Sequence, residues 1–125
     1  MDKELIAKIS KDFETLKGNA LGILLFGSHA IEHETVRSDI DVCIVAPKAE
    51  PKEIFDQILK TTLPGRYDIK IFETLPLKIK GDIIDNHIIV WTRDKGELTY
   101  YLYKWGKVWK DQKMALRREG MEIFS

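Results

Sequence analysis

The sequence predicts an α/β (α+β) fold in which helices flank a sheet of about four strands, followed by a long C-terminal helix. Three observations carry this prediction. Short apolar or alternating segments of strand length recur along the chain, amphipathic segments with helical spacing lie between them, and turn residues separate the two kinds. Interleaved helices and strands are typical of a sheet that helices cover, because each apolar strand face needs a partner layer.

Each element has its own signal. The first helix has apolar residues at helical spacing and ends at a glycine. The first two strands are continuous apolar runs of the buried kind, whereas the third alternates. A glycine inside the third helix is expected to weaken that helix. In chain order, we expect a helix at 2–17, strands at 20–26 and 40–45, a helix at 51–60, a strand at 67–72, a short helix at 76–86, a strand at 87–91 and a helix at 97–119.

The composition limits the classes of protein to consider. A chain of 125 residues, 44% hydrophobic and 32% charged, fits one globular domain over 1–125 with its core at about 1–95. The formal net charge of zero gives no overall field that would attract nucleic acid or a membrane. The charged opening shows neither a signal peptide nor a membrane span, so we expect a cytoplasmic protein. Cys43 is the only cysteine, which excludes an intrachain disulfide, and its apolar surroundings are typical of a core.

Two carboxylates at the start of the second strand indicate a metal site. Asp39 and Asp41 are two residues apart, so strand alternation directs both side chains to one face. Carboxylates at that range repel each other unless a cation lies between them. Oxygen ligands suit a hard ion such as Mg²⁺ or Mn²⁺. The apolar residues that follow continue into the core, which leaves the pair near the accessible start of the strand.

A glycine-serine turn ends the preceding strand. Gly27 allows a backbone to approach a ligand closely, and Ser28 offers a hydroxyl and a backbone N–H that can donate to phosphate oxygens. A hairpin-like return from Ser28 to Asp39 would bring this turn beside the carboxylates. Each motif alone also fits a simple turn or a solvated strand start. Together they suit phosphoryl or nucleotidyl transfer, in which the protein mainly positions phosphates.

The joint motif resembles a known family. LLFGS, with ten residues between Gly27-Ser28 and the DID of RSDIDVCIV, is similar to the signature of minimal members of the DNA polymerase beta-like nucleotidyltransferase superfamily. The resemblance implies a nucleotidyltransferase-like mixed β-sheet flanked by helices. It also implies that Ser28 touches the triphosphate and that Asp39 and Asp41 bind two metal ions. The loop departs from the family pattern, because it lacks a second glycine and Arg37 is its only Lys or Arg. We expect the nucleotide to be bound by Gly27, Ser28, Arg37 and Ser38.

The family usually has a third carboxylate on a neighbouring strand. Asp68, in RYDIKIFE, matches this acid and is expected to act as the general base or as an electrostatic partner. Strand alternation places Lys70 on the same face, where it is a candidate to touch phosphate or to pair with Asp68. Glu73 is the competitor, but alternation directs it to the opposite face. The expected catalytic and metal-binding set is therefore Asp39, Asp41 and Asp68.

The resemblance implies a metal-dependent enzyme that moves a nucleoside monophosphate from a nucleoside triphosphate, expected to be ATP, to an acceptor hydroxyl. Larger relatives continue into a helical domain where this chain ends, so we expect a partner or a homodimer to supply the acceptor. Minimal relatives are often antitoxins paired with a HEPN-type helical toxin, which makes such a protein the expected partner. The alternative is a binding module with a weak or inactive site that neutralises the partner by contact alone.

The expected final helix carries two stripes. Leu98, Leu102, Trp105 and Trp109 have helical spacing, which we interpret as packing on the sheet. The segment 104–118 has six cations and one acid, a net charge of +5. A solvated face is the ordinary interpretation of such cations. An acidic partner or an RNA backbone is the alternative, so nucleic-acid binding is open but not favoured.

Overall fold

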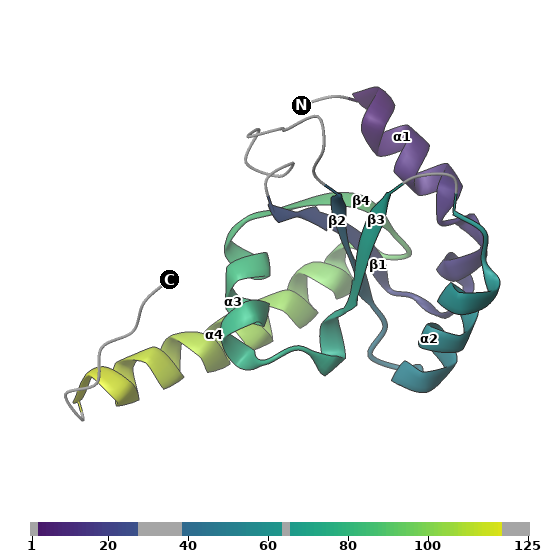
Figure 1. The fold of residues 1–125 in the computed structure, drawn as a ribbon. Helices are drawn as coiled ribbons and strands as arrows, with labels where there is room; N and C mark the ends of the chain where they lie inside the picture. The colour runs from purple at the N-terminus through teal and green to yellow at the C-terminus, as the bar shows by residue number, and fades with distance from the viewer. Residues whose placement is uncertain (1–2, 28–38, 64–65, 119–125) are drawn as a thin grey trace.

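The sheet is mixed and has four strands, as the sequence predicts. The computed structural model describes residues 3–27, 39–63 and 66–118. The strands lie in the order β3-β2-β1-β4, with β1 antiparallel to both neighbours and β2 parallel to β3. Figure 1 shows this sheet between the helices. The bounds are Gly22–Phe26 for β1, Ile40–Val45 for β2, Tyr67–Ile71 for β3 and His87–Thr92 for β4.

The helices agree with the expected pattern except near the N-terminus. The single helix expected over 2–17 is wrong beyond residue 12, where a 3₁₀ helix takes over and buries Phe13 and Leu16 completely. The last helix begins two residues before its expected start, because Asp94 Oδ1 accepts a hydrogen bond from Glu97 N at 2.9 Å and caps it. The helices are α1 (Lys3–Asp12), η1 (Glu14–Asn19), α2 (Pro51–Lys60), η3 (Phe72–Thr74), α3 (Leu77–Asp85) and α4 (Lys95–Arg118).

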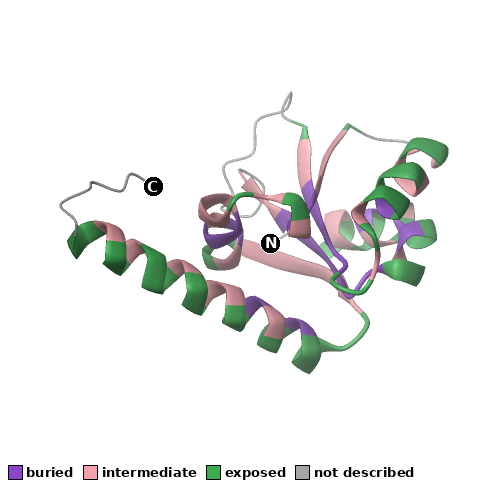
Figure 2. Cartoon of the chain, turned by 90° about the horizontal axis from the view of Figure 1, so that it is seen from below, coloured by how far each residue is buried: buried purple, intermediate pink, exposed green. Residues whose placement is uncertain are grey.

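Two apolar layers cover the two faces of the sheet. On one face, Ile9 of α1 and Ile54 of α2 are fully buried against β1 and β2. On the other face, Ile83 of α3 and Leu98 of α4 pack with Cys43 of β2. Figure 2 shows buried residues gathered in the strands and on the inner sides of the helices. Each strand therefore directs alternate residues to the α1/α2 face and to the α3/α4 face.

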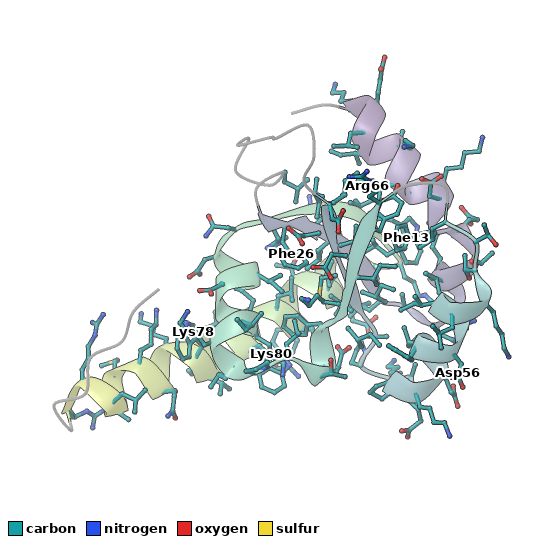
Figure 3. All side chains as sticks on the ribbon, viewed as in Figure 1. Phe13, Phe26, Asp56, Arg66, Lys78 and Lys80 are labelled. Carbon is teal, nitrogen blue, oxygen red and sulfur yellow. The ribbon has the colours of Figure 1, made fainter. Side chains whose placement is uncertain are left out.

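The packing of α3 on α4 explains the glycine that the sequence placed inside a helix. A Cβ at Gly81 would collide with the indole of Trp109, so this glycine permits the close approach of the two helices. Lys80 is buried beside it, and its Nζ donates to Leu75 O at 2.7 Å and lies 4.4 Å from the centre of the Trp105 ring. Figure 3 shows Lys80 on α3 beside α4. The expected apolar stripe of α4 thus packs on α3 as well as on the sheet.

The C-terminal half of α4 extends beyond the sheet (Figure 1). The cationic side chains Lys107 and Lys110 on this half, and Lys104 in the turn before it, are exposed, which agrees with a solvated face. Within the described ranges, no helix combines the length and the apolar character that a membrane crossing requires.

Candidate active site

One edge of the sheet gathers the predicted carboxylates. Because β1 runs against β2 and β3, the end of β1 meets the starts of the other two strands. Asp41 lies opposite Phe26 on one side and opposite Asp68 on the other. Ile40 and Tyr67 pack on the α1/α2 face, so Asp41 and Asp68 point together to the α3/α4 face. The structure therefore brings two of the three expected acids side by side.

Asp39 lies at the same edge. It directly precedes β2 and is exposed, as a side chain near the accessible start of a strand should be. Three of the residues expected to bind nucleotide, Ser28, Arg37 and Ser38, lie outside the described residues. Their roles stay predictions.

Gly27 has a conformation and a neighbour that both require glycine. Its φ is 75°, in the left-handed region that other residues rarely adopt. A Cβ on Gly27 would also collide with Oδ2 of Asp41. The backbone at the end of β1 thus lies directly against a carboxylate of the site; the close approach to a ligand that the sequence suggests for Gly27 stays a prediction.

Lys70 supplies a positive charge beside the two acids. It lies opposite Cys43 in the parallel ladder, on the α3/α4 face, and its Nζ is 3.3 Å from Asp68 Oδ1. The side chains are 40% and 45% exposed, so water screens this pair and it contributes little to stability. Its effect is local, because it offsets part of the repulsion between Asp41 and Asp68.

The donor chemistry of this edge fits a hard divalent cation. Asp41 and Asp68 present carboxylate oxygens from adjacent strands, and the lack of a side chain at Gly27 lets Asp41 Oδ2 lie directly against the backbone. Among residues 3–27, 39–63 and 66–118, no three His, Cys, Asp or Glu side chains are arranged to hold a metal ion. The three-carboxylate metal site stays a prediction.

Glu73 does not compete with Asp68, although its expected direction was wrong. The strand ends at Ile71, and the 3₁₀ turn that follows directs Glu73 toward α4 rather than to the opposite face. Its Oε1 accepts from Ala46 N at 3.0 Å and its Oε2 accepts from the Tyr101 hydroxyl at 2.8 Å. Ala46 follows the end of β2, so Glu73 ties elements together at the far end of the sheet from Asp41.

Two other side chains that could carry chemistry are structural. Cys43 is fully buried, and burial raises the pKa of its thiol, so little thiolate forms. His87 Nδ1 lies 2.9 Å from Ile83 O and 3.1 Å from Ile84 O. Because carbonyl oxygens only accept, Nδ1 carries the proton and closes the last turn of α3.

A cavity of about 390 Å³ adjoins the carboxylate edge, and sequence reasoning missed it. It lies between the end of β1 and α3; Figure 3 shows Phe26 in this region. Asp82 of α3 and Asn86, which directly follows the last residue of that helix, supply polar groups to it. Their spacing of four residues just before β4 was the available signal. The lining residues are Phe26, Gly27, Lys70, Ile79, Asp82, Ile83 and Asn86.

Comparison with known proteins agrees with this architecture. A chain from a crystal structure of a toxin-antitoxin with AMP-PNP superimposes with a TM-score of 0.70 at 15% identity, over 90% of this chain and 93% of that chain. A chain from the structure of a tri-AMPylated Shewanella oneidensis HEPN toxin in complex with MNT antitoxin gives 0.68 at 15% identity, over 94% of both chains. At such identities the likeness shows the fold.

Sequence comparison goes further. A Methanocaldococcus jannaschii protein named "Putative protein adenylyltransferase" is 45% identical over 96 residues, which are 77% of this chain and 75% of that protein. The family model described as "Polymerase beta, Nucleotidyltransferase" matches residues 6–96, a span that includes Gly27, Asp39, Asp41 and Asp68. The resemblance inferred from the sequence motif is thereby confirmed, and the chain belongs to the polymerase beta nucleotidyltransferase family.

Proposed function

We propose that this protein is a cytoplasmic, metal-dependent nucleotidyltransferase that moves AMP from ATP to a hydroxyl group on a partner protein. The observation that carries the proposal is the pairing of Asp41 with Asp68 on one face, directly against the backbone of Gly27. A phosphate cradle beside paired carboxylates suits phosphoryl and nucleotidyl transfer, where positioning and charge neutralisation supply most of the catalysis.

The choice of ATP and of a protein acceptor draws support from related proteins. The Methanocaldococcus jannaschii relative has a name that assigns it adenylyl transfer to protein. Among the structures with the same fold, one contains AMP-PNP and another contains an AMPylated HEPN toxin with its MNT antitoxin. We infer that a HEPN-type helical protein is the partner of this chain, which would then act as its antitoxin; a second copy of the chain is the other source of an acceptor.

The proposed reaction has one bond-forming and one bond-breaking event. The acceptor oxygen attacks the α-phosphorus of ATP, the bond from that phosphorus to the bridging oxygen breaks, and pyrophosphate leaves. Asp68 acts as the general base and takes the proton of the acceptor hydroxyl as its oxygen attacks. Lys70, which pairs with Asp68, holds that carboxylate in place on the α3/α4 face.

The remaining roles follow from position. Asp39 and Asp41 would hold Mg²⁺ or Mn²⁺, together with Asp68, at the start of β2. The metal would offset the negative charge of the triphosphate and of the departing pyrophosphate. Gly27 and Ser28 would donate backbone N–H groups, and Ser28 its hydroxyl, to phosphate oxygens, with Arg37 and Ser38 beside them.

The site is tested by nucleotide binding to the Asp39→Asn variant. We expect the variant to lose Mg²⁺-dependent ATP binding in isothermal titration calorimetry while its melting temperature is unchanged, because Asp39 is exposed. Asp111→Asn, which removes an exposed acid on α4, is the matched control and should bind as the wild type does. Wild-type binding by Asp39→Asn would overturn the assigned site.

The alternative is a binding module that neutralises the partner by contact alone. Incubation of the protein with labelled ATP, Mg²⁺ and the product of its neighbouring gene distinguishes the enzyme from the binding module. Label on the partner that disappears in Asp41→Asn supports the enzyme. A stable complex without any label supports the module.

A further inference from the structure

We propose that the cavity between the end of β1 and α3 receives the nucleobase of the nucleoside triphosphate, and that Asp82 and Asn86 select adenine there. This inference rests on the proposed function, since it assigns a binding site to the nucleobase, the part of the substrate that the phosphate-binding and metal-binding residues do not contact.

The position of the cavity fits the part of a nucleotide that lies beyond the phosphates. Phe26 and Gly27 line it, and Phe26 is the direct sheet neighbour of Asp41. Residues paired in an antiparallel ladder have Cα atoms about 5 Å apart, so the cavity opens one strand spacing from the carboxylates. A nucleotide held by its phosphates at Gly27 and Asp41 can therefore extend its sugar and base toward α3. The volume of about 390 Å³ lies within the range of small-molecule sites, about 300 to 1,000 Å³.

The walls of the cavity suit a flat aromatic ring. Phe26 contributes an aromatic side chain, and Ile79 and Ile83 contribute aliphatic surface from α3. Ile83 is 2% exposed and packs in the core between α3 and the sheet, so this wall is fixed before any ligand arrives. Bases stack on aromatic side chains regardless of their identity, so these walls give affinity but no choice of base.

The polar side of the cavity can distinguish one base from another. Asp82 lies on α3 and Asn86 directly follows the last residue of that helix, and both line the cavity. An asparagine amide both donates and accepts, which matches a ring nitrogen and the amino group of adenine. A carboxylate accepts from that amino group and repels a carbonyl oxygen, as guanine and uracil carry at the equivalent position. Asp82 Oδ2 also lies 3.5 Å from Lys78 Nζ, and both side chains are nearly half exposed. Water screens this ion pair, so the Asp82 carboxylate remains available to accept a hydrogen bond from the base.

A second cavity offers a comparison. It has about 400 Å³ and lies between α2 and β3, lined by Phe55, Ile58 and Ile69 among others. It shares Lys70 with the first cavity, but Gly27 does not line it. Its lining includes no acid and no amide, so it lacks the groups that would distinguish one base from another.

The test compares three ligands on the full chain with Mg²⁺: ATP, GTP and inorganic tripolyphosphate, each by isothermal titration calorimetry. We expect the wild type to bind ATP more tightly than GTP.

Variants of the cavity test its lining. Asn86→Ala should weaken ATP binding about tenfold, the equivalent of one lost hydrogen bond, without changing tripolyphosphate binding. Asp82→Ala should reduce the preference for ATP over GTP. Ile79→Trp, which fills the cavity, should lose the advantage of ATP over tripolyphosphate, and Phe55→Ser in the second cavity should bind as the wild type does.

The outcomes distinguish this inference from the proposed function. Equal ATP binding by the wild type, Asn86→Ala and Ile79→Trp, with melting temperatures showing that the variants fold, would overturn the nucleobase site and leave the triphosphate site standing. Failure of the wild type to bind either ATP or tripolyphosphate would overturn the proposed function itself. Unchanged ATP binding with loss of label transfer in Ile79→Trp would assign the cavity to the acceptor instead.

Discussion

Gly27 combines a left-handed backbone with direct contact to a carboxylate of the site. In Gly27→Ala, the positive φ costs about 1–2 kcal/mol, and the added methyl group displaces Asp41. We therefore expect a lower free energy of unfolding in urea together with weaker Mg²⁺-dependent ATP binding. Gly18→Ala is the control, because a Cβ at Gly18 meets no atom within 4 Å. Wild-type stability in Gly27→Ala would contradict the described geometry.

Tyr67 predicts how stability responds to alkaline pH. Its hydroxyl donates to Asp12 Oδ2 at 2.6 Å, and burial, followed by the hydrogen bond and the charge of Asp12, raises its pKa. Below about pH 10 the phenol is protonated in both the folded and the unfolded chain, so its full contribution is present. Above about pH 10 the unfolded chain ionises first, and the free energy of unfolding falls as pH rises.

The measurement for Tyr67 is urea unfolding at a series of alkaline pH values. Tyr67→Phe should show a shallower fall of the unfolding free energy than the wild type. Burial also raises the pKa of Tyr101, so the slope should decrease without vanishing. An unchanged slope would mean that the Tyr67 phenol titrates alike in both states.

At the scale of elements, the contact between α3 and α4 makes a paired prediction about two glycines. Alanine usually stabilises a helix interior relative to glycine, by up to about 1 kcal/mol. At Gly81 the added Cβ would collide with Trp109, so Gly81→Ala should be destabilising by about 1–3 kcal/mol. At Gly106 the nearest atom, Ile84 Cγ2, is 3.5 Å from the Cβ position, so Gly106→Ala should be neutral or stabilising. Thermal unfolding of both variants measures this difference, and equal shifts of their melting temperatures would contradict the described packing of α3 on α4.

The same elements show what sequence patterns can and cannot predict. Alternation predicted that Asp39 and Asp41 share a face of one strand and that Asp68 and Lys70 share a face of another, because period two is a local property of each strand. That Asp41 and Asp68 lie opposite each other depends on the register between strands 27 residues apart, which no local pattern specifies. The family resemblance supplied only the expectation that Asp68 lies on a neighbouring strand.

Contacts between distant helices were out of reach for the same reason. Gly81 looked like a weakness of its helix because the side chain that requires it, Trp109, is 28 residues away. Lys80 gave no sign of burial, since Trp105, whose ring centre lies 4.4 Å from its Nζ, becomes a neighbour only when α3 packs on α4. Glu73 changed direction because a 3₁₀ turn ended the strand one residue early, and such boundaries depend on packing.

At the scale of the whole molecule, charge is unevenly distributed. The segment 104–118 carries +5, so the remainder of this neutral chain carries −5. Lys107 and Lys110 are exposed on the part of α4 that extends beyond the sheet (Figure 1). Opposite charges on two regions of a molecule orient it toward a charged partner and accelerate association, and salt suppresses that acceleration.

This distribution predicts salt-dependent association with an acidic partner. Lys107→Glu combined with Lys110→Glu should slow association with the proposed HEPN-type partner by about tenfold at low salt, with a smaller effect at high salt. The melting temperature should not change, because both side chains are exposed. Surface plasmon resonance over a series of salt concentrations measures the rate. The rival interpretation is that α4 binds RNA. It predicts that the wild type binds RNA in a salt-sensitive way and that the double variant loses this binding.

The central position of β1 has a consequence for synthesis of the chain. Residues 22–26 pair with β2 on one side and with β4, at 87–92, on the other. Contacts so distant in sequence form late, because the intervening chain must first be ordered. When the ribosome has translated the chain only as far as β3, Asp39, Asp41 and Asp68 have already been synthesised. At that point β1 has no strand to pair with on the side that β4 will occupy. Under the proposed function, competence to bind ATP should therefore arise only once β4 has emerged.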